Sequence, residues 1–337
     1  MHFVFRAVSE GQPGPKWTRL FAEYWPHYRR WWTRDGIEAR PTYRDSRAAM
    51  RAHMPELEPV YEALCEQAGG GDLEARFLSF YCPPPYLSGC SQAIWPGAEP
   101  VMVRNYDYAP RAFDGVVLHT RWGRRTVMGM SDGLFGLVDG MNDAGLAVSL
   151  TFGGRRVVGD GFGVPLILRY VLETCETAEQ AGRALARIPC HMSYNVTVID
   201  RRRDYLTALL APDRPALITH AAVATNHQER VEWQGHARFT ATVERERYLL
   251  QRLTLHREPK EKFVAAFLKP PLYSTAFGHG FGTLYTAVYE PKRRALTLRW
   301  PGAVWPKRLN RFVDDAREVH YPLAAETEGA SPYASTP

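Results

Sequence analysis

Apolar side chains recur with helical spacing through much of the first 89 residues. Between residues 17 and 32, aromatic residues and leucine follow the i, i+3, i+4, i+7 pattern that places them on one helix face. Such a face more often docks on the rest of a fold than binds a ligand, and Pro26 is expected to kink or split the helix. Two further helical runs, residues 56–68 and 72–81, end at a triple glycine and a triple proline. The pattern predicts a helical segment over residues 1–89 that closes with an extended linker.

Beyond the linker the pattern changes to short runs rich in Val, Leu, Thr and aromatic residues, separated by turn pairs such as Pro-Gly and Asp-Gly. These runs predict strands at 90–96, 100–108, 115–122, 126–130, 133–142, 145–152, 195–200, 205–211, 216–225, 283–291 and 295–300. Helical spacing returns at 165–175, 178–188 and 240–253. This order predicts an α+β fold of antiparallel sheets covered by helices, followed by a disordered tail over residues 323–337.

The net charge of +6 and the isoelectric point of about 9.1 change this picture little. Basic residues occur in short clusters interrupted by acidic ones, so an anionic substrate fits them better than nucleic acid. No stretch approaches the roughly 18 consecutive apolar residues of a membrane helix, and the first residues lack the features of a secretory signal. We therefore expect a cytoplasmic protein with neither a nucleic-acid nor a membrane partner.

The cysteine and histidine content argues against a metal or cofactor site. Five cysteines, an odd number with no CxxC pair, fit neither a disulfide framework nor a closed zinc site and favour a reducing compartment. The eleven histidines show no paired ligand spacing, and no glycine-rich phosphate loop occurs. No metal and no cofactor are expected.

Cys90 has a chemically distinctive position, since it follows Gly89 between the linker and the first predicted strand. Glycine leaves its carbonyl open to attack by the thiol of the next residue. Hydrolysis of the resulting thioester would free the α-amino group of Cys90, whose ordinary pKa of roughly 7.7–8.0 lets it act as base for the same thiol. A Gly-Cys pair alone, however, more often marks a buried structural cysteine.

The strand that follows carries the sequence Arg-Asn-Tyr-Asp-Tyr at residues 104–108. Strand alternation places Arg104 and Tyr106 on one face and Asp107 on the other. An aspartate near an N-terminal ammonium can hydrogen-bond it, and an arginine can orient a thiolate or a substrate carboxylate. The alternative is a surface strand with a local Arg–Asp pair.

Several motifs in order resemble those of one superfamily: Gly89-Cys90, then residues 104–108, 139–146, 150–152 and 224–227. The superfamily comprises the acyl-coenzyme A:6-aminopenicillanate acyltransferases (peptidase family C45), the choloylglycine hydrolases and the penicillin V acylases. The helical run before the linker is similar to the pro-segment of the acyltransferase branch, which choloylglycine hydrolases lack. The resemblance, over roughly residues 55–300, implies a four-layer αββα sandwich of N-terminal-nucleophile type.

The resemblance also implies that the chain cuts itself between Gly89 and Cys90. Residues 1–89 would remain bound as a small subunit, and residues 90–322 would form the catalytic domain. Cys90 would be the nucleophile, Asp107 the partner of its amino group, and Arg104 a residue that orders the thiol and the substrate.

The same resemblance implies an oxyanion hole and a substrate site. Asn226 would donate from its side chain, and the backbone near Thr151 would supply a second donor, although hydrolase relatives often have asparagine at that place. Tyr106 and a further arginine would complete the substrate site. Spacing suggests Arg245 for that arginine, with Arg247 close behind, and a solvated arginine on a helix face is the alternative.

Two polar positions have simpler explanations. Residues 139–143, with their Asp-Gly and Asn-Asp pairs, are expected to form only a turn between strands. Asn195 is expected to cap the start of a strand.

We therefore expect an amide hydrolase or acyltransferase that acts on a small-molecule amide or acyl donor through a Cys90 thioester. Acyl-coenzyme A is a candidate co-substrate, and the choice between water and an amine as acceptor stays open. The competing hypothesis is an unprocessed, non-catalytic binding protein with the same fold.

Overall fold

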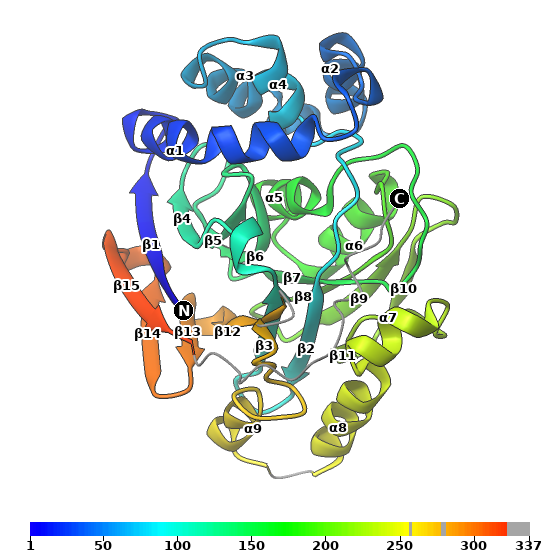
Figure 1. The fold of residues 1–337 in the computed structure, drawn as a ribbon. Coiled ribbons are helices and arrows are strands. Elements are labelled where there is room, and N and C mark those ends of the chain that lie inside the picture. The colour runs from blue at the N-terminus through cyan, green and yellow to red at the C-terminus, as the bar shows by residue number, and fades with distance from the viewer. Residues whose placement is uncertain (256–257, 278–280, 322–337) are drawn as a thin grey trace.

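Two stacked β-sheets form the centre of the molecule (Figure 1). The computed structural model describes residues 1–255, 258–277 and 281–321. Their strands follow the order β10-β9-β8-β7-β6-β5-β4-β1-β15 in the larger sheet and β11-β2-β3-β12-β13-β14 in the smaller one. One apolar core joins residues of both sheets. With helices outside each sheet, this is the predicted α+β sandwich of αββα type.

The larger sheet has nine strands. In chain order they are β1 (His2–Glu10), β4 (Val116–Thr120), β5 (Val127–Asp132), β6 (Gly136–Asn142), β7 (Ala147–Phe152), β8 (Tyr194–Ile199), β9 (Tyr205–Leu210), β10 (Leu217–Thr219) and β15 (Asp315–His320). The smaller sheet consists of β2 (Gly89–Trp95), β3 (Val101–Tyr108), β11 (Val223–Ala224), β12 (Gly282–Glu290), β13 (Ala295–Trp300) and β14 (Ala303–Arg308).

The helices form three groups (Figure 1). The N-terminal group lies over one end of the sandwich and consists of α1 (Pro15–Trp32), α2 (Tyr43–His53), α3 (Glu58–Gln67) and α4 (Asp72–Leu78). Against the larger sheet lie α5 (Val164–Thr174) and α6 (Ala178–Arg187). Beside the smaller sheet lie α7 (Gln234–Phe239), α8 (Thr242–Thr254) and α9 (Lys260–Ala266).

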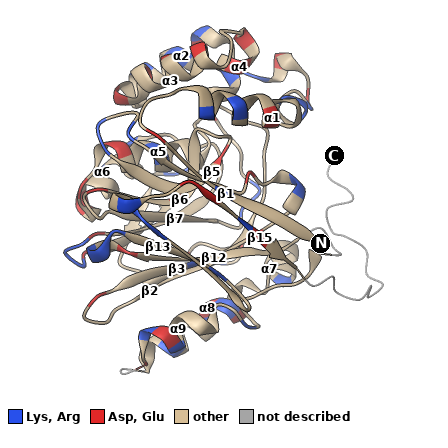
Figure 2. Cartoon of the chain, turned by 90° about the vertical axis from the view of Figure 1, so that its left-hand side faces the viewer, with Lys and Arg blue, Asp and Glu red and all other residues tan. Residues whose placement is uncertain are grey.

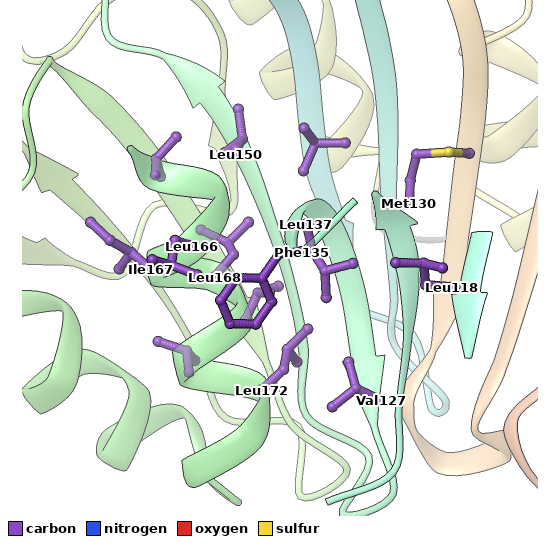
Figure 3. Packing of buried hydrophobic residues seen from close by; sticks show 14 of the residues in the cluster. Leu118, Val127, Met130, Phe135, Leu137, Leu150, Leu166, Ile167, Leu168 and Leu172 are labelled. Carbon is purple, nitrogen blue, oxygen red and sulfur yellow. The ribbon is translucent and has the colours of Figure 1, made fainter. Parts of the chain in front are cut away.

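Helix α5 packs closely on β6 because two glycines remove side chains from the contact. A Cβ atom on Gly140 would lie 2.8 Å from Cδ1 of Leu172, and one on Gly136 would lie 2.6 Å from Cβ of Pro165. Figure 3 shows the leucines of α5 next to Phe135 and the apolar side chains of the sheet. All residues of α5 from Val164 to Glu173 are buried, and its two charged side chains, Arg169 and Glu173, form an ion pair with each other at 2.8 Å.

The N-terminal segment differs from its prediction at the beginning. Residues 1–89 were expected to be helical, but His2–Glu10 forms β1, which pairs in parallel with β4 and antiparallel with β15. The sequence of β1 shows no clear alternation of apolar and polar residues, because only Phe5 and Ala7 in it are fully buried. The predicted helices are present, and Pro26 does not divide α1.

Smaller differences concern the C-terminal half. Residues 216–225 form two strands, β10 and β11, which belong to different sheets. The edge strands β14 and β15 and the short helices α7 and α9 were not predicted, because their exposed positions weaken any period. The predicted tail over residues 323–337 lies outside the described residues.

Charged residues of both signs are distributed over the helices and loops (Figure 2). Within the described ranges, no helix is both long and apolar enough to cross a membrane.

The place of β1 in the sheet can be tested with Phe5, which is fully buried and contacts the rings of Trp300 and Phe113 at centroid distances of 4.9 and 5.6 Å. We expect Phe5→Ala to lower the free energy of unfolding by about 3–5 kcal/mol. The neighbouring Val4 is 43% exposed, so Val4→Ala should lower it by about 0.5 kcal/mol or less. Urea unfolding followed by circular dichroism measures both values, and equal losses would contradict the role given to β1.

Candidate active site

Cys90 is the second residue of β2, and its side chain is completely buried. Its Sγ atom lies 3.3 Å from Nη2 of Arg104 and 3.8 Å from Oγ of Ser88. Burial raises the pKa of the Cys90 thiol, while the Arg104 guanidinium and a backbone N–H of Asp107 act in the opposite direction. The thiol therefore has donors ready for its anion, in a place that water does not reach in the intact chain.

Arg104 projects from β3 into the space between the sheets and is held there by partners on both sides. Its guanidinium forms a fully buried ion pair with Asp139 of β6, and its Nε atom donates to the Leu150 carbonyl at 3.0 Å. Asp139 also accepts hydrogen bonds from the hydroxyls of Tyr285 (2.6 Å) and Tyr289 (2.5 Å). The arginine beside the thiol is thereby fixed in direction.

Asp139 corrects the prediction that residues 139–143 form only a turn. Its position is inside β6, opposite Ser149 of β7, and the turn begins at Asn142, whose Oδ1 accepts from the N–H groups of Ala144 and Leu146. The apolar residues around Asp139 could have distinguished a strand position from a turn position. A buried aspartate within an apolar run needs a buried cationic partner.

Asn226 lies in the loop after β11 and contacts Cys90 directly. Its Oδ1 accepts a hydrogen bond from the Cys90 N–H at 3.0 Å and from Nη2 of Arg245 at 2.6 Å. Its Nδ2 donates to the carbonyls of Phe152 (3.2 Å) and Ser88 (3.4 Å). The amide donor thus lies one residue before the Gly89–Cys90 bond.

Arg245 reaches the same point from α8 and is 3% exposed. Its Nη1 atom donates to the Cys90 carbonyl and to Oγ of Ser91, each at 2.8 Å, and lies 3.3 Å from Oδ2 of Asp107. The prediction from spacing therefore chose the arginine that enters the site. The alternative, a solvated arginine on a helix face, applies to Arg247, whose side chain is exposed.

Asp107 lies on the opposite face of β3 from Arg104, as strand alternation predicted. Its carboxylate is paired with Arg245 and accepts a hydrogen bond from Thr283 at 2.6 Å. Burial raises its pKa to about 6, although Arg245 and Thr283 lower it. In the intact chain the N–H of Cys90 donates to Asn226 and not to Asp107. Arg245 contacts both Asp107 and Asn226 and so connects the carboxylate to this amide.

Thr151 and Asn195 fix the loop that carries Asn226. The Thr151 hydroxyl donates to the Thr225 carbonyl at 2.6 Å. Asn195 donates to the Thr225 and His227 carbonyls, both at 2.9 Å, and to the Thr151 hydroxyl at 3.1 Å. Asn195 was expected to be a strand cap, but it is a buried anchor between two strands and this loop.

Tyr106 lies next to the arginine that faces the thiol. Its ring stacks against Arg104, with the guanidinium carbon 4.5 Å from the ring centroid. The tyrosine therefore supports Arg104 from the strand that carries both residues.

Gly89 has no room for a side chain. A Cβ atom would lie 2.2 Å from the ring of Phe281 and 3.3 Å from Cβ of Asp107. Because all three residues are buried, a larger residue would displace the bond that precedes Cys90. Among the described residues, no group of three or more His, Cys, Asp or Glu side chains could hold a metal ion.

A family model described as acyl-coenzyme A:6-aminopenicillanic acid acyl-transferase matches residues 95–305, which is 211 of 337 residues. The matched range contains Arg104, Asp107, Asn226 and Arg245 and begins just after Cys90. It agrees with the resemblance seen in the sequence motifs. A comparison with curated protein sequences gives no significant match.

Solved structures similar to this chain include three acylases or amidases. Penicillin V acylase from Agrobacterium tumefaciens has 14% identity and a TM-score of 0.49, over 66% of this chain and 87% of that chain. An N-acylethanolamine-hydrolyzing acid amidase ortholog from Caenorhabditis elegans has 15% identity and a TM-score of 0.43, over 60% and 93%. A mutant of conjugated bile acid hydrolase from Clostridium perfringens has 13% identity and a TM-score of 0.40, over 71% and 99%.

The buried ion pair behind the thiol can be tested by Asp139→Asn. We expect this change to lower the free energy of unfolding by about 3–5 kcal/mol, because it leaves the charge of Arg104 buried and unpaired. Asp143→Asn, which removes a partner of Arg125 at a site where the aspartate is 36% exposed, should cost about 1 kcal/mol or less. Denaturant unfolding in a Cys90→Ala background compares the variants as uncut chains. Similar losses of unfolding free energy in the two variants would show that the Arg104–Asp139 pair stabilises the fold no more than an exposed ion pair does.

Proposed function

Because this chain belongs to the acyl-coenzyme A:6-aminopenicillanic acid acyl-transferase family, we propose that it is a self-processing amide hydrolase or acyltransferase whose nucleophile is Cys90. The observation that carries the proposal is the convergence of Arg104, Asn226 and Arg245 on the thiol, the N–H and the carbonyl of this one residue. A buried backbone N–H and carbonyl need partners in any residue, but a merely structural cysteine needs no guanidinium beside its sulfur.

Self-processing would begin with attack of the Cys90 thiol on the Gly89 carbonyl carbon. A carbon–sulfur bond forms, the Gly89–Cys90 amide bond breaks, and the thiol proton passes to the departing nitrogen. Water then hydrolyses the thioester, which leaves a carboxylate on Gly89 and returns the thiol of Cys90 with a free α-amino group. We propose the Nδ2 atom of Asn226, which donates to the Ser88 carbonyl at 3.4 Å, as the donor that would turn to the oxyanion formed on Gly89.

In the processed enzyme the α-amino group of Cys90 would take the proton of its own thiol. The thiolate, stabilised by Arg104, attacks the acyl carbon of the substrate, and Asn226 donates to the oxyanion. Removing one such donor typically costs about 10²–10³ in rate. The ammonium then protonates the leaving amine, and an acyl thioester remains on Cys90.

The acceptor decides the net reaction. Water yields an amidase, and an amine yields an acyltransferase, for which acyl-coenzyme A is a candidate acyl donor. Asp107 would lie next to the new ammonium group and, with Arg245, set its proton affinity.

We further propose that residues 1–89 remain bound after the cut. Support comes from β1, an inner strand of the larger sheet between β4 and β15. Helix α1 adds Trp17, whose buried Nε1 donates to the Leu134 carbonyl at 2.8 Å. Loss of the segment would expose these surfaces and open the sheet.

Processing can be read by intact mass. We expect the wild-type protein to give fragments of roughly 10 and 28 kDa by proportion of chain length, and the large fragment to begin at Cys90. Cys90→Ala should remain a single chain of about 38.3 kDa without activity, whereas Cys175→Ala should behave like the wild type, because Cys175 is a buried thiol at the end of α5. A wild-type chain that stays uncut and does not react with an acylating thiol probe would favour the binding-protein hypothesis.

The pH dependence of processing follows from Asp107. Its pKa of about 6 means that the carboxylate becomes protonated below that pH and loses its charge interaction with Arg245. We expect the rate of cleavage of freshly synthesised chains to fall by about tenfold per pH unit below pH 6. Asp107→Asn should be slower and independent of pH in this range. A transition near pH 6 that persists in Asp107→Asn would rule out Asp107 as its source.

A further inference from the structure

A small cavity lies where the N-terminal segment meets the sandwich, and its wall is aromatic on almost every side. It has a volume of about 40 Å³. The lining comes from α1, from the linker, and from the ends of β3 and β5: His27, Tyr28, Trp31, Phe80, Tyr86, Tyr108, Ala112 and Asp132. Trp31 makes edge contact with Tyr86 at a centroid distance of 6.0 Å, so two of the walls brace each other. One carboxylate, that of Asp132, faces this aromatic surround.

Asp132 has no cationic partner at this place. Within residues 1–255, 258–277 and 281–321, no Lys, Arg or His lies within ion-pair distance of its carboxylate. The nearby Tyr28 hydroxyl has a single proton, which it donates to Asp114, and it accepts from the Gly133 N–H at 2.9 Å. Asp114 is further satisfied by the Ser131 hydroxyl at 2.8 Å. The Tyr28 hydroxyl, the Gly133 N–H and the more distant charge of Arg104 also act on Asp132 and lower its pKa. What Asp132 lacks is an ion-pair partner at close range.

The electrostatic consequence supports a site for a cation. Burial, and then the neighbouring Asp114, raise the pKa of Asp132 to about 8. A positive charge in the cavity would favour the ionised form of this carboxylate. Aromatic faces attract the same charge through their quadrupoles, and the attraction increases when the cation is desolvated.

The cavity is connected to the thiol by a continuous stack. The ring of Tyr108 lies 5.5 Å from that of Tyr106, the Arg104 guanidinium lies 4.5 Å from the centre of Tyr106, and Arg104 reaches the thiol of Cys90. Tyr86 in the opposite wall is four residues before Cys90 in the chain. Side-chain contacts through Tyr108, Tyr106 and Arg104 therefore connect the wall of the cavity to Cys90.

We propose that this cavity is a subsite for a positively charged amine of the substrate, such as a primary or methylated ammonium group, with Asp132 as its counter-ion. The proposal rests on the function proposed above and narrows the substrate class to amides or acyl acceptors that carry a cation. It also gives the N-terminal segment a share in recognition, since Tyr28 and Trp31 come from one side of the cut and Tyr108 and Asp132 from the other.

The test uses ligand-observed NMR titration of the uncut Cys90→Ala chain with butylammonium and its neutral isostere 1-pentanol. We expect butylammonium to bind roughly tenfold more tightly than the alcohol. Asp132→Asn, which keeps the shape of the side chain, should abolish the preference, whereas Asp143→Asn should retain it. Trp31→Leu should weaken butylammonium binding and leave the alcohol nearly unchanged.

Equal binding of the two ligands, or a preference that survives in Asp132→Asn, would overturn the subsite. Neither result depends on catalysis, because the chain lacks the thiol. Failure of the proposed function would appear separately, as an uncut wild-type chain in the mass measurement. Circular dichroism melting of each variant verifies that the comparison is made between folded proteins.

Discussion

The candidate site depends on one buried guanidinium, that of Arg245. A charge removed from water is tolerated only where its partners replace the lost hydration. Those partners come from β2, from β3 and from the loop after β11, so α8 must bring all of them to one point: the Cys90 carbonyl, Ser91, Asp107 and Asn226. The requirement fixes the backbone of Cys90 before any substrate is present.

A second buried arginine does the same for the sulfur. Because alternate residues of a strand face opposite sides, β3 presents Arg104 to the space between the sheets and Asp107 to the helix layer. Cys90 on the adjacent strand is therefore held from both sides, its carbonyl from the helix side and its thiol from the interior. The tyrosines around Asp139 keep the interior partner in place.

Sequence periodicity predicted most strands of the sandwich. The central strands are either apolar throughout, because both faces are buried, or show a regular alternation of apolar and polar residues. It missed β1 and β15, which lie at the end of the sheet where few positions are buried. Cys90, Arg104, Asp107 and Asn226, which motif order singled out, lie together in the structure, and so does Arg245, which spacing suggested. Asp139 and Asn195 were misjudged for a common reason: turn-forming residue types conceal a buried role that only a distant partner reveals. No local pattern encodes that partner.

The pairing of β1 with β15 joins the two ends of the described chain: His2 lies opposite His320. Such a contact closes only after the chain has been synthesised beyond residue 320. Two neighbours of Cys90, Asn226 and Arg245, likewise lie 136 and 155 residues downstream. While the chain is intact, the pairing of its two ends is an intramolecular step that does not depend on protein concentration. Once the bond before Cys90 is cut, an unfolded protein would be two molecules, and reassembly would depend on their concentration. Cleavage would thus convert a reversible fold into one maintained by the slowness of its unfolding.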